Sequence, residues 1–362
     1  PALSPNDEFA DFEMFQVLLG TGGQIGQVDN SYVRQALIRG IGFQEAIGAN
    51  PFKYGIVAGA DAHTAFADNE EFNYSGVHGV NDDSPKRRLS GAGQTAGEPA
   101  LKFGTPGTTA VWADENTREG IFDAIVRKET YGTSGTFIRL RFFGGWNYTS
   151  DLLNDNDMIK KAYQGGVPMG GDLPEKPTTA KAPTFIVQAL KDPESGNLDR
   201  IQIVKGWYAG GYGWEKVYDV VWSDDRKPAP AGGEEYRIVT TDGKNVSTRY
   251  VTIPEGKLPP VGNTVDVKNA TYTNDIGDTQ LSGVWTDPDF DPALHAVYYI
   301  RVLEIPTPRW STYDAKALGI EVPEGVPATI QERAWSSPIW YTPNPELVKK
   351  PGFYPGLYKK VH

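Results

Sequence analysis

Asp61 and His63 are the residues of this chain whose types and spacing best fit a chemical role. They stand two positions apart, so in an extended backbone both side chains project from the same face. A carboxylate beside an imidazole can ligate a divalent metal ion or exchange protons with a substrate. The alternative is structural, with the carboxylate capping a turn and the imidazole held by a local hydrogen bond. Spacing alone leaves both interpretations open.

The segments before this pair predict how it is positioned. An apolar run over 56–58 is bounded by glycines, which predicts a short buried strand ending just before Asp61. A helix is expected over 32–48, with Ser31 as its cap and Gly48 at its end, because apolar residues recur there at i, i+4. Helix, strand and loop in this order are typical of an α/β unit, which keeps its active site at the carboxyl ends of its strands.

A long polar, glycine-rich stretch over 64–115 follows the pair. Loops of this length in a compact domain are usually functional or disordered. His78 lies in this stretch, and a loop that follows the Asp61 strand would lie over the same site. His78 is therefore a candidate ligand or substrate contact; the alternative is a surface histidine that makes a loop hydrogen bond.

The rest of the chain divides by its periodicity. A second helix is expected over 117–129, followed by a half-buried strand over 137–143 in which two arginines share a face. After residue 183 the helical period fades, and short β-type runs recur between turn residues, which is typical of an antiparallel sandwich. The expected organisation is an α/β part over 1–150, a connector over 151–182, a β-rich part over 183–342 and a proline-rich extended tail over 343–362.

Composition excludes several classes of protein. The 362 residues carry a net charge of −11, which argues against general affinity for nucleic acid, because phosphate binding needs a basic surface. There are no cysteines, so disulfides and thiolate metal sites are excluded. No apolar run approaches the length that spans a membrane. The four histidines are too few to build a complete multi-histidine metal site from this chain alone.

Residues 55–63 (GIVAGADAH) resemble the last metal-binding motif of the polymerase and histidinol phosphatase (PHP) superfamily, and residues 118–135 resemble the helix and turn that follow it. More broadly, the chain resembles the C-terminal half of a bacterial family related to that superfamily, the domain-of-unknown-function 3604 family. The further segments that carry this resemblance are 4–13 (SPNDEFADFE), 214–222 (WEKVYDVVW), 287–292 (DPDFDP), 301–310 (RVLEIPTPRW) and 331–341 (QERAWSSPIWY).

The resemblance implies a fold and a reaction. The fold would be α/β plus β, with part of a PHP-like distorted β/α barrel followed by a β-rich, sandwich-like region. The reaction would be metal-dependent hydrolysis, foremost of a small-molecule phosphoester, by a water activated on divalent zinc, manganese or iron. Asp61 and His63 match the final ligand pair of such a site. The earlier ligands of the superfamily are expected before Pro1, in a companion segment or chain.

The resemblance also suggests substrate contacts and a location. His78, Arg118, Thr133 and Ser134 are the candidates for substrate binding, and a periplasmic or extracellular location is expected because the family commonly looks exported. A competing hypothesis is a non-catalytic, β-rich protein that binds carbohydrate or the cell envelope. It rests on the nine tryptophans of the chain, since aromatic rings serve as sugar-stacking platforms. The alternative for those rings is core packing, and bound metal would discriminate between the two functions.

Overall fold

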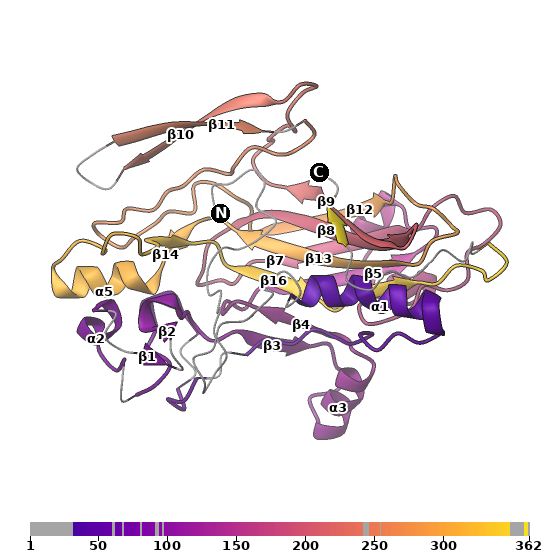
Figure 1. Cartoon of the computed structure of the whole chain (residues 1–362), viewed down its shortest axis with the longest axis horizontal. Coiled ribbons are helices and arrows are strands. Elements are labelled where there is room, and N and C mark those ends of the chain that lie inside the picture. The colour runs from indigo at the N-terminus through magenta and orange to yellow at the C-terminus, as the bar shows by residue number, and fades with distance from the viewer. Residues whose placement is uncertain are drawn as a thin grey trace.

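The computed structural model describes residues 32–59, 62–66, 69–79, 82–90, 94–95, 98–241, 246–253, 255–347 and 358–360. Two sheets lie at the centre of this part of the molecule, with helices around their edges and faces (Figure 1). The helices are α1 (Val33–Ile47), α2 (Pro85–Leu89), α3 (Arg118–Val126), α4 (Met158–Gly165) and α5 (Trp310–Leu318), with 3-10 turns η2 (Glu71–Asn73), η3 (Ala100–Lys102) and η4 (Ser150–Asn154).

The larger sheet has the strand order β18-β9-β8-β13-β16-β4-β3, and β17 also pairs with β13. All of these pairs are antiparallel except β18 with β9. The strands are β3 (Thr108–Val111), β4 (Thr130–Thr133), β8 (Leu198–Ala209), β9 (Tyr212–Trp222), β13 (Ala296–Glu304), β16 (Arg333–Ser336), β17 (Ile339–Tyr341) and β18 (Tyr358–Lys360).

The smaller sheet is antiparallel, with the order β12-β7-β5-β6. Its strands are β5 (Arg139–Gly145), β6 (Gly166–Pro168), β7 (Thr184–Leu190) and β12 (Gln280–Thr286). Three two-stranded antiparallel sheets complete the described strands: β1 (Gln94–Thr95) with β2 (Glu98–Pro99), β10 (Glu234–Thr241) with β11 (Val246–Ile253), and β14 (Thr307–Pro308) with β15 (Thr329–Ile330). Both large sheets thus combine strands from the two sides of residue 150.

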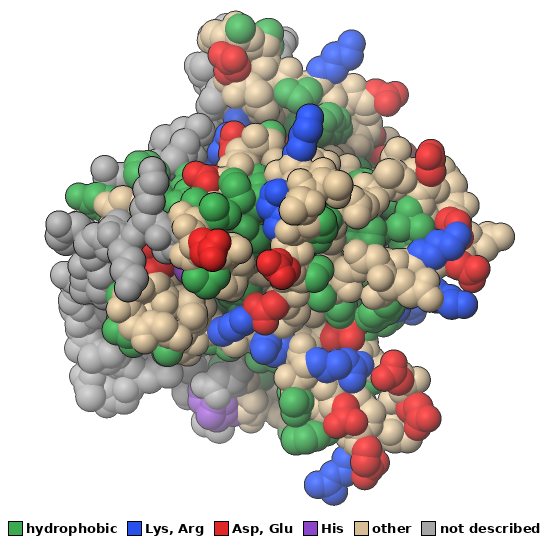
Figure 2. All heavy atoms as spheres, turned by 90° about the vertical axis from the view of Figure 1, so that its right-hand side faces the viewer, with side chains coloured by type: hydrophobic (Ala, Val, Ile, Leu, Met, Phe, Trp, Pro, Cys, Tyr) green, Lys and Arg blue, Asp and Glu red, His purple; other side chains and the backbone are tan. Residues whose placement is uncertain are grey.

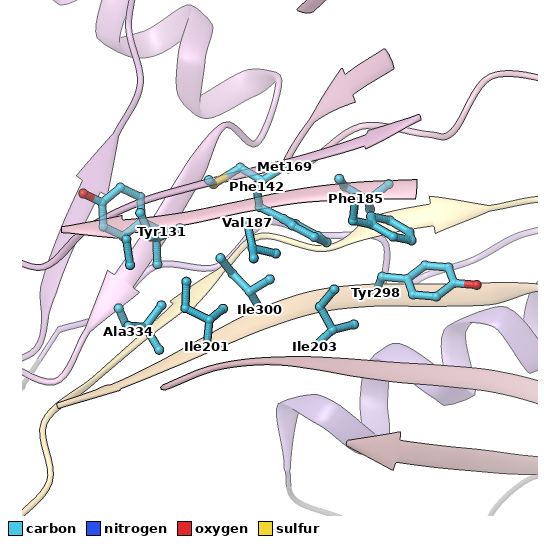
Figure 3. Close-up of a cluster of buried hydrophobic side chains, with 14 of the residues drawn as sticks. Tyr131, Phe142, Met169, Phe185, Val187, Ile201, Ile203, Tyr298, Ile300 and Ala334 are labelled. Carbon is cyan, nitrogen blue, oxygen red and sulfur yellow. The ribbon is translucent and has the colours of Figure 1, made fainter. Parts of the chain in front are cut away.

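The two sheets pack face to face around a dry core. Side chains alternate between the faces of a strand, so the even-numbered Tyr298, Ile300 and Val302 of β13 point toward the smaller sheet. There they meet Phe185 and Val187 of β7 (Figure 3). All five are fully buried, at 0% exposure. Burying such side chains is the main favourable contribution to folding.

The opposite face of the larger sheet is covered by α1. Leu37, Ile38 and Ile41 recur at helical spacing and pack against sheet residues that include Val204 and Val297. The helix ends at Gly48, whose left-handed φ of 76° lets its N–H bond back to Gln44 O at 3.0 Å. The expected helices over 32–48 and 117–129 are confirmed as α1 and α3, but the N-cap of α1 is Tyr32 and not the expected Ser31, which lies outside the described residues.

The expected PHP-like β/α barrel is wrong. A β/α barrel needs parallel strands that close on themselves, whereas the described strands form open, mostly antiparallel sheets. Tight turns such as the one at Gly210 and Gly211 (φ 61° and 84°) favour antiparallel neighbours, because parallel strands need a long crossover. Even β3 and β4, which are joined through α3, run antiparallel. The β-type runs expected after residue 183 are found as β7 to β13.

The surface carries charges of both signs. Figure 2 shows a face on which Lys and Arg side chains are interspersed with Asp and Glu side chains, consistent with the modest net charge of −11 spread over 362 residues. Among the helices described, none combines the length and the hydrophobicity required to span a membrane.

Candidate functional site

The segment that leads to the candidate site is extended but belongs to no sheet. Over 55–59 the described backbone has no strand partner, and Val57 is 63% exposed, so the expected buried strand over 56–58 is wrong. Hydroxyl groups of the larger sheet and of the short connection between β16 and β17 hold the segment instead. Ile56 N–H donates to Ser337 Oγ (2.8 Å), and Ile56 O accepts from Thr130 Oγ1 (2.8 Å). Side-chain hydroxyls thus replace the backbone ladder of a true strand.

Thr109 repeats this arrangement one step along the segment. Its Oγ1 accepts from Ala58 N–H at 3.0 Å and donates to Ala58 O at 2.6 Å. The sheet beneath is built from glycines at this point: a Cβ at Gly107 or Gly132 would lie 2.9 or 2.8 Å from Ala58 Cβ. Such a distance is shorter than carbon atoms tolerate, so these glycines permit the close approach of the segment to β3 and β4.

His63 and His78 lie together beyond the end of this segment. Their rings stack with centroids 4.2 Å apart and an interplanar angle of 23°. His63 N–H donates to Val77 O (2.7 Å), which fixes the two chain segments side by side. Asp82 closes the loop, because its carboxylate accepts from Val77 N–H (2.8 Å) and His78 N–H (2.7 Å) while being only 1% exposed. The imidazole of His63 is exposed and that of His78 is half-buried.

Asp61 lies outside the described residues, so its place relative to the histidines stays a prediction. Imidazole is the commonest metal ligand among side chains, and the two rings lie close enough that rotating one of them out of the stack would bring a nitrogen of each to one ion. A catalytic zinc site takes three protein ligands, and no group of three His, Asp or Glu side chains suited to a metal occurs within the part of the chain that the structure describes. The two described histidines are therefore ligands of the right type for such a site, but they supply fewer than the three that it needs.

The other candidate contacts are dispersed. Arg118 is the first residue of α3, which stands away from the sheets, and its side chain is exposed (Figure 1). Thr133 is 1% exposed and accepts Gly135 N–H at 3.2 Å. Ser134 donates to the carboxylate of Glu332 and accepts Arg333 N–H at 2.8 Å. The last two therefore have structural partners, and no hydrogen bond or ion pair between described residues joins Arg118 to either histidine.

A buried carboxyl cluster beside Ser134 was not anticipated from the sequence. Glu71, from η2, hydrogen-bonds Glu332 and accepts the N–H of Trp310 and the hydroxyl of Thr105. Burial raises the pKa of Glu71, while the nearby Arg309 guanidinium acts to lower it. Glu71 lies in a polar loop and Glu332 in an irregular segment, so no periodic pattern marks either as buried. The cluster connects the loop that carries His78 to the strand ends of the larger sheet.

Comparison with protein families gives one match. The model of the family described as "Protein of unknown function (DUF3604)" matches residues 1–252 and 244–343. Neither the comparison with curated proteins nor that with solved structures gave a match. Because the matched stretches cover most of the sequence, the chain belongs to the DUF3604 family.

Proposed function

We propose that the chain acts in metal-dependent hydrolysis of a phosphoester, with His63 and His78 as metal ligands and Asp61 as a third. The observation that carries the proposal is the stacked histidine pair, whose rings come from two separate chain segments and meet at 4.2 Å. On the sequence side, residues 55–63 resemble a metal-binding motif of the PHP superfamily. A relation to that superfamily is part of the proposal, without its barrel.

The protein's contribution is to hold the two backbone segments that carry the histidines side by side before a ligand arrives. The backbone of His63 is tied to Val77, and the backbone of His78 is tied to Asp82, so bringing the rings together costs little additional conformational entropy. His63 is exposed enough to meet a small molecule from solvent. A bound divalent ion would supply a water of lowered pKa and stabilise negative charge on a phosphoryl oxygen.

The competing carbohydrate-binding function has less support. Trp146, Trp310 and Trp340 are 6%, 1% and 2% exposed and pack within hydrophobic clusters, so their rings offer little surface to a sugar. Core packing accounts for these three residues without a ligand.

The test is metal binding by calorimetry on metal-free protein, followed by turnover of p-nitrophenyl phosphate with and without chelator. Replacing one of two or three protein ligands should weaken manganese or zinc binding by about tenfold or more in His63→Ala and in His78→Ala. His295→Gln is the matched control, because His295 contacts Glu45 at 3.3 Å and is not part of the pair. Unchanged affinity in the double variant H63A/H78A, or turnover that a chelator does not reduce, would refute the proposal.

A further inference from the structure

A cavity of about 490 Å³ lies where β5 begins, beside the face of the larger sheet that is turned toward the smaller one. Its lining comes from β3, from β4, from the residues at the start of β5 and from the turn that follows β7. β6 pairs with β5 only over 143–145, so among the described strands none covers this side of the beginning of β5. The volume falls within the range of pockets that hold small organic ligands.

The floor of the cavity is apolar. Ala110 of β3, Tyr131 of β4 and Ile138 line it. Tyr131 and Ile138 belong to the core between the sheets, and Tyr131 stands at one end of the labelled side chains in Figure 3. Phe137 also lines the cavity, although its side chain is 52% exposed. An exposed aromatic ring beside an apolar floor provides contact area for a ligand with an apolar body.

Charged groups of both signs line the same cavity and come from neighbouring stretches of backbone. Arg139 pairs with Leu190 in the register of β5 and β7, and Asp192 follows two residues after Leu190. The carboxylate of Asp192 is 5% exposed and accepts Phe137 N–H at 2.7 Å and Glu194 N–H at 3.0 Å. These bonds fix the turn, so that the guanidinium of Arg139 and the carboxylates of Asp192 and Glu194 border one space.

The charged groups can meet a ligand without breaking the fold. Arg139 and Glu194 are exposed, so their charged ends are hydrated and can exchange water for a ligand. The oxygens of a carboxylate together accept about four hydrogen bonds, so the buried Asp192 can accept a further donor besides the two N–H groups that hold it.

The pKa values of nearby groups report both signs of charge. Burial raises the pKa of Tyr131, whereas the guanidinium charge of Arg139 acts to lower it. Burial likewise raises the pKa of Glu304, and the negative charge of Asp192 adds to that rise. Positive charge therefore reaches one wall of the cavity, and negative charge acts from the turn after β7. Such a cavity favours a ligand that carries both charges.

We propose that this cavity binds a free α-amino acid with an apolar side chain. The carboxylate of the ligand would meet Arg139, and its ammonium group would meet Asp192 and Glu194, because charge-assisted hydrogen bonds are the strongest that these groups make. Its side chain would lie against Phe137 and the apolar floor. The inference goes beyond the proposed hydrolysis, since every lining residue lies within 108–194 and none belongs to the histidine pair.

The test is calorimetry on the metal-free protein with three probes of similar shape. L-phenylalanine carries both charges, N-acetyl-L-phenylalanine keeps only the carboxylate, and L-phenylalaninamide keeps only the ammonium group. Phenylalanine should bind about tenfold or more tightly than either derivative, because each derivative loses one charge-assisted contact. Equally tight binding of one derivative, or no binding of phenylalanine at millimolar concentration, would overturn the proposal.

Two charge variants should act on different probes. Arg139→Gln should weaken the binding of phenylalanine about fivefold and leave that of the amide unchanged, because the amide has no carboxylate. Glu194→Gln should weaken the binding of phenylalanine to a similar extent and leave that of the acetylated probe unchanged. Both positions are exposed, so the variants should fold normally. Wild-type affinity for phenylalanine in both variants, or an equal loss for all three probes, would overturn the proposal.

Phe137→Ala tests the apolar part of the site. It should weaken the binding of all three probes about fivefold, because each of them has the aromatic ring. Phe122→Ala is the matched control, since Phe122 is 62% exposed on α3 and does not line the cavity. It should leave every affinity unchanged, and an equal loss in the two variants would contradict a specific contact with Phe137.

His63→Ala separates this site from the proposed metal site. The variant should keep the wild-type affinity for phenylalanine whether or not the protein is a hydrolase, because His63 does not line the cavity. Failure of the metal tests would therefore leave this proposal standing, whereas loss of phenylalanine binding in His63→Ala would contradict a separate site.

Discussion

The two faces of strand β13 differ in what they bury. The even-numbered side chains, such as Tyr298 and Ile300, enter a dry core between the sheets and are fully excluded from solvent. On the other face, the odd-numbered Val297 packs against α1, whereas Tyr299 and Arg301 line a cavity beside the first turn of that helix. One face thus buries mainly apolar side chains, and the other combines apolar packing with a buried arginine. The difference teaches that the alternation of a strand decides which side chains share a face, but not whether that buried face is apolar.

The strongest test of the dry face is Phe185→Ala. Phe185 is 0% exposed and its ring stacks on Phe142 with centroids 5.4 Å apart, so truncation leaves a large cavity in a rigid core. The free energy of unfolding should fall by about 3–5 kcal/mol in urea titrations. The exposed Phe66→Ala (68% exposed) is the control and should cost little. A similar loss in both variants would argue against the dry core as the source of stability.

The next largest effect on the free energy of unfolding is expected from Glu304, a buried carboxyl group at the C-terminal end of β13. Burial raises the pKa of Glu304 to about 8, and Ser195 Oγ donates to its Oε2 at 2.5 Å. Because the pKa in the folded state lies above the ordinary value of 4.5, stability is greatest below pH 4.5 and is lost as pH rises toward 8. Glu304→Gln removes this dependence, so between pH 5 and 7 the variant should gain about 2–3 kcal/mol relative to the wild type.

The measurement is the free energy of unfolding of both proteins at pH 5, 6 and 7. Glu324→Gln, at an exposed position, is the control and should follow the wild-type profile. Parallel pH profiles for the wild type and Glu304→Gln would show that the dry face tolerates the charged carboxylate.

Local periodicity predicted the elements of this fold better than their arrangement. The i, i+4 spacing of Leu37 and Ile41 marked α1, and the alternating runs marked β7, β8 and β13. Strand direction is not encoded locally: β3 and β4 flank α3 as in a parallel unit, yet their register pairs Thr108 with Thr133 in antiparallel fashion. The expectation of a β/α barrel was wrong because the pairing of strands in the tertiary structure, and not the local sequence, decides whether neighbouring strands run parallel or antiparallel.

The candidate site was also predictable only where its residues lie near one another in the sequence. The position of His78 in the loop after His63 suggested that the two residues are neighbours, and the structure places their rings in contact. Their catalytic role stays a prediction. Arg301 and Arg333 carried no signal, since each stands in a β-type string where an arginine is usually solvated or ion-paired. Only the packing of α1 and the extended segment above them makes these positions the floor of a cavity.

Among these variants, Gly132→Ala is expected to have the smallest effect on stability, and it should also weaken metal binding. A Cβ there would lie 2.8 Å from Ala58 Cβ and 3.1 Å from Ala58 N, so the extended segment must move. The cost should be about 1–3 kcal/mol, less than that of Phe185→Ala. The displaced segment leads to His63, so metal affinity should fall although neither histidine is changed directly.

Gly59→Ala is the matched control, because no atom lies within 4 Å of the place that its added methyl group would occupy, and the substitution should leave stability and metal affinity unchanged. Hydrogen exchange of the Ile56 and Ala58 amides would locate the effect: both donate to sheet hydroxyls and should exchange faster in Gly132→Ala only. Normal metal affinity together with faster exchange would mean that the segment merely covers the sheet. Reduced metal affinity with an intact core between the sheets would show that the glycines beneath Ala58 position the segment that leads to His63.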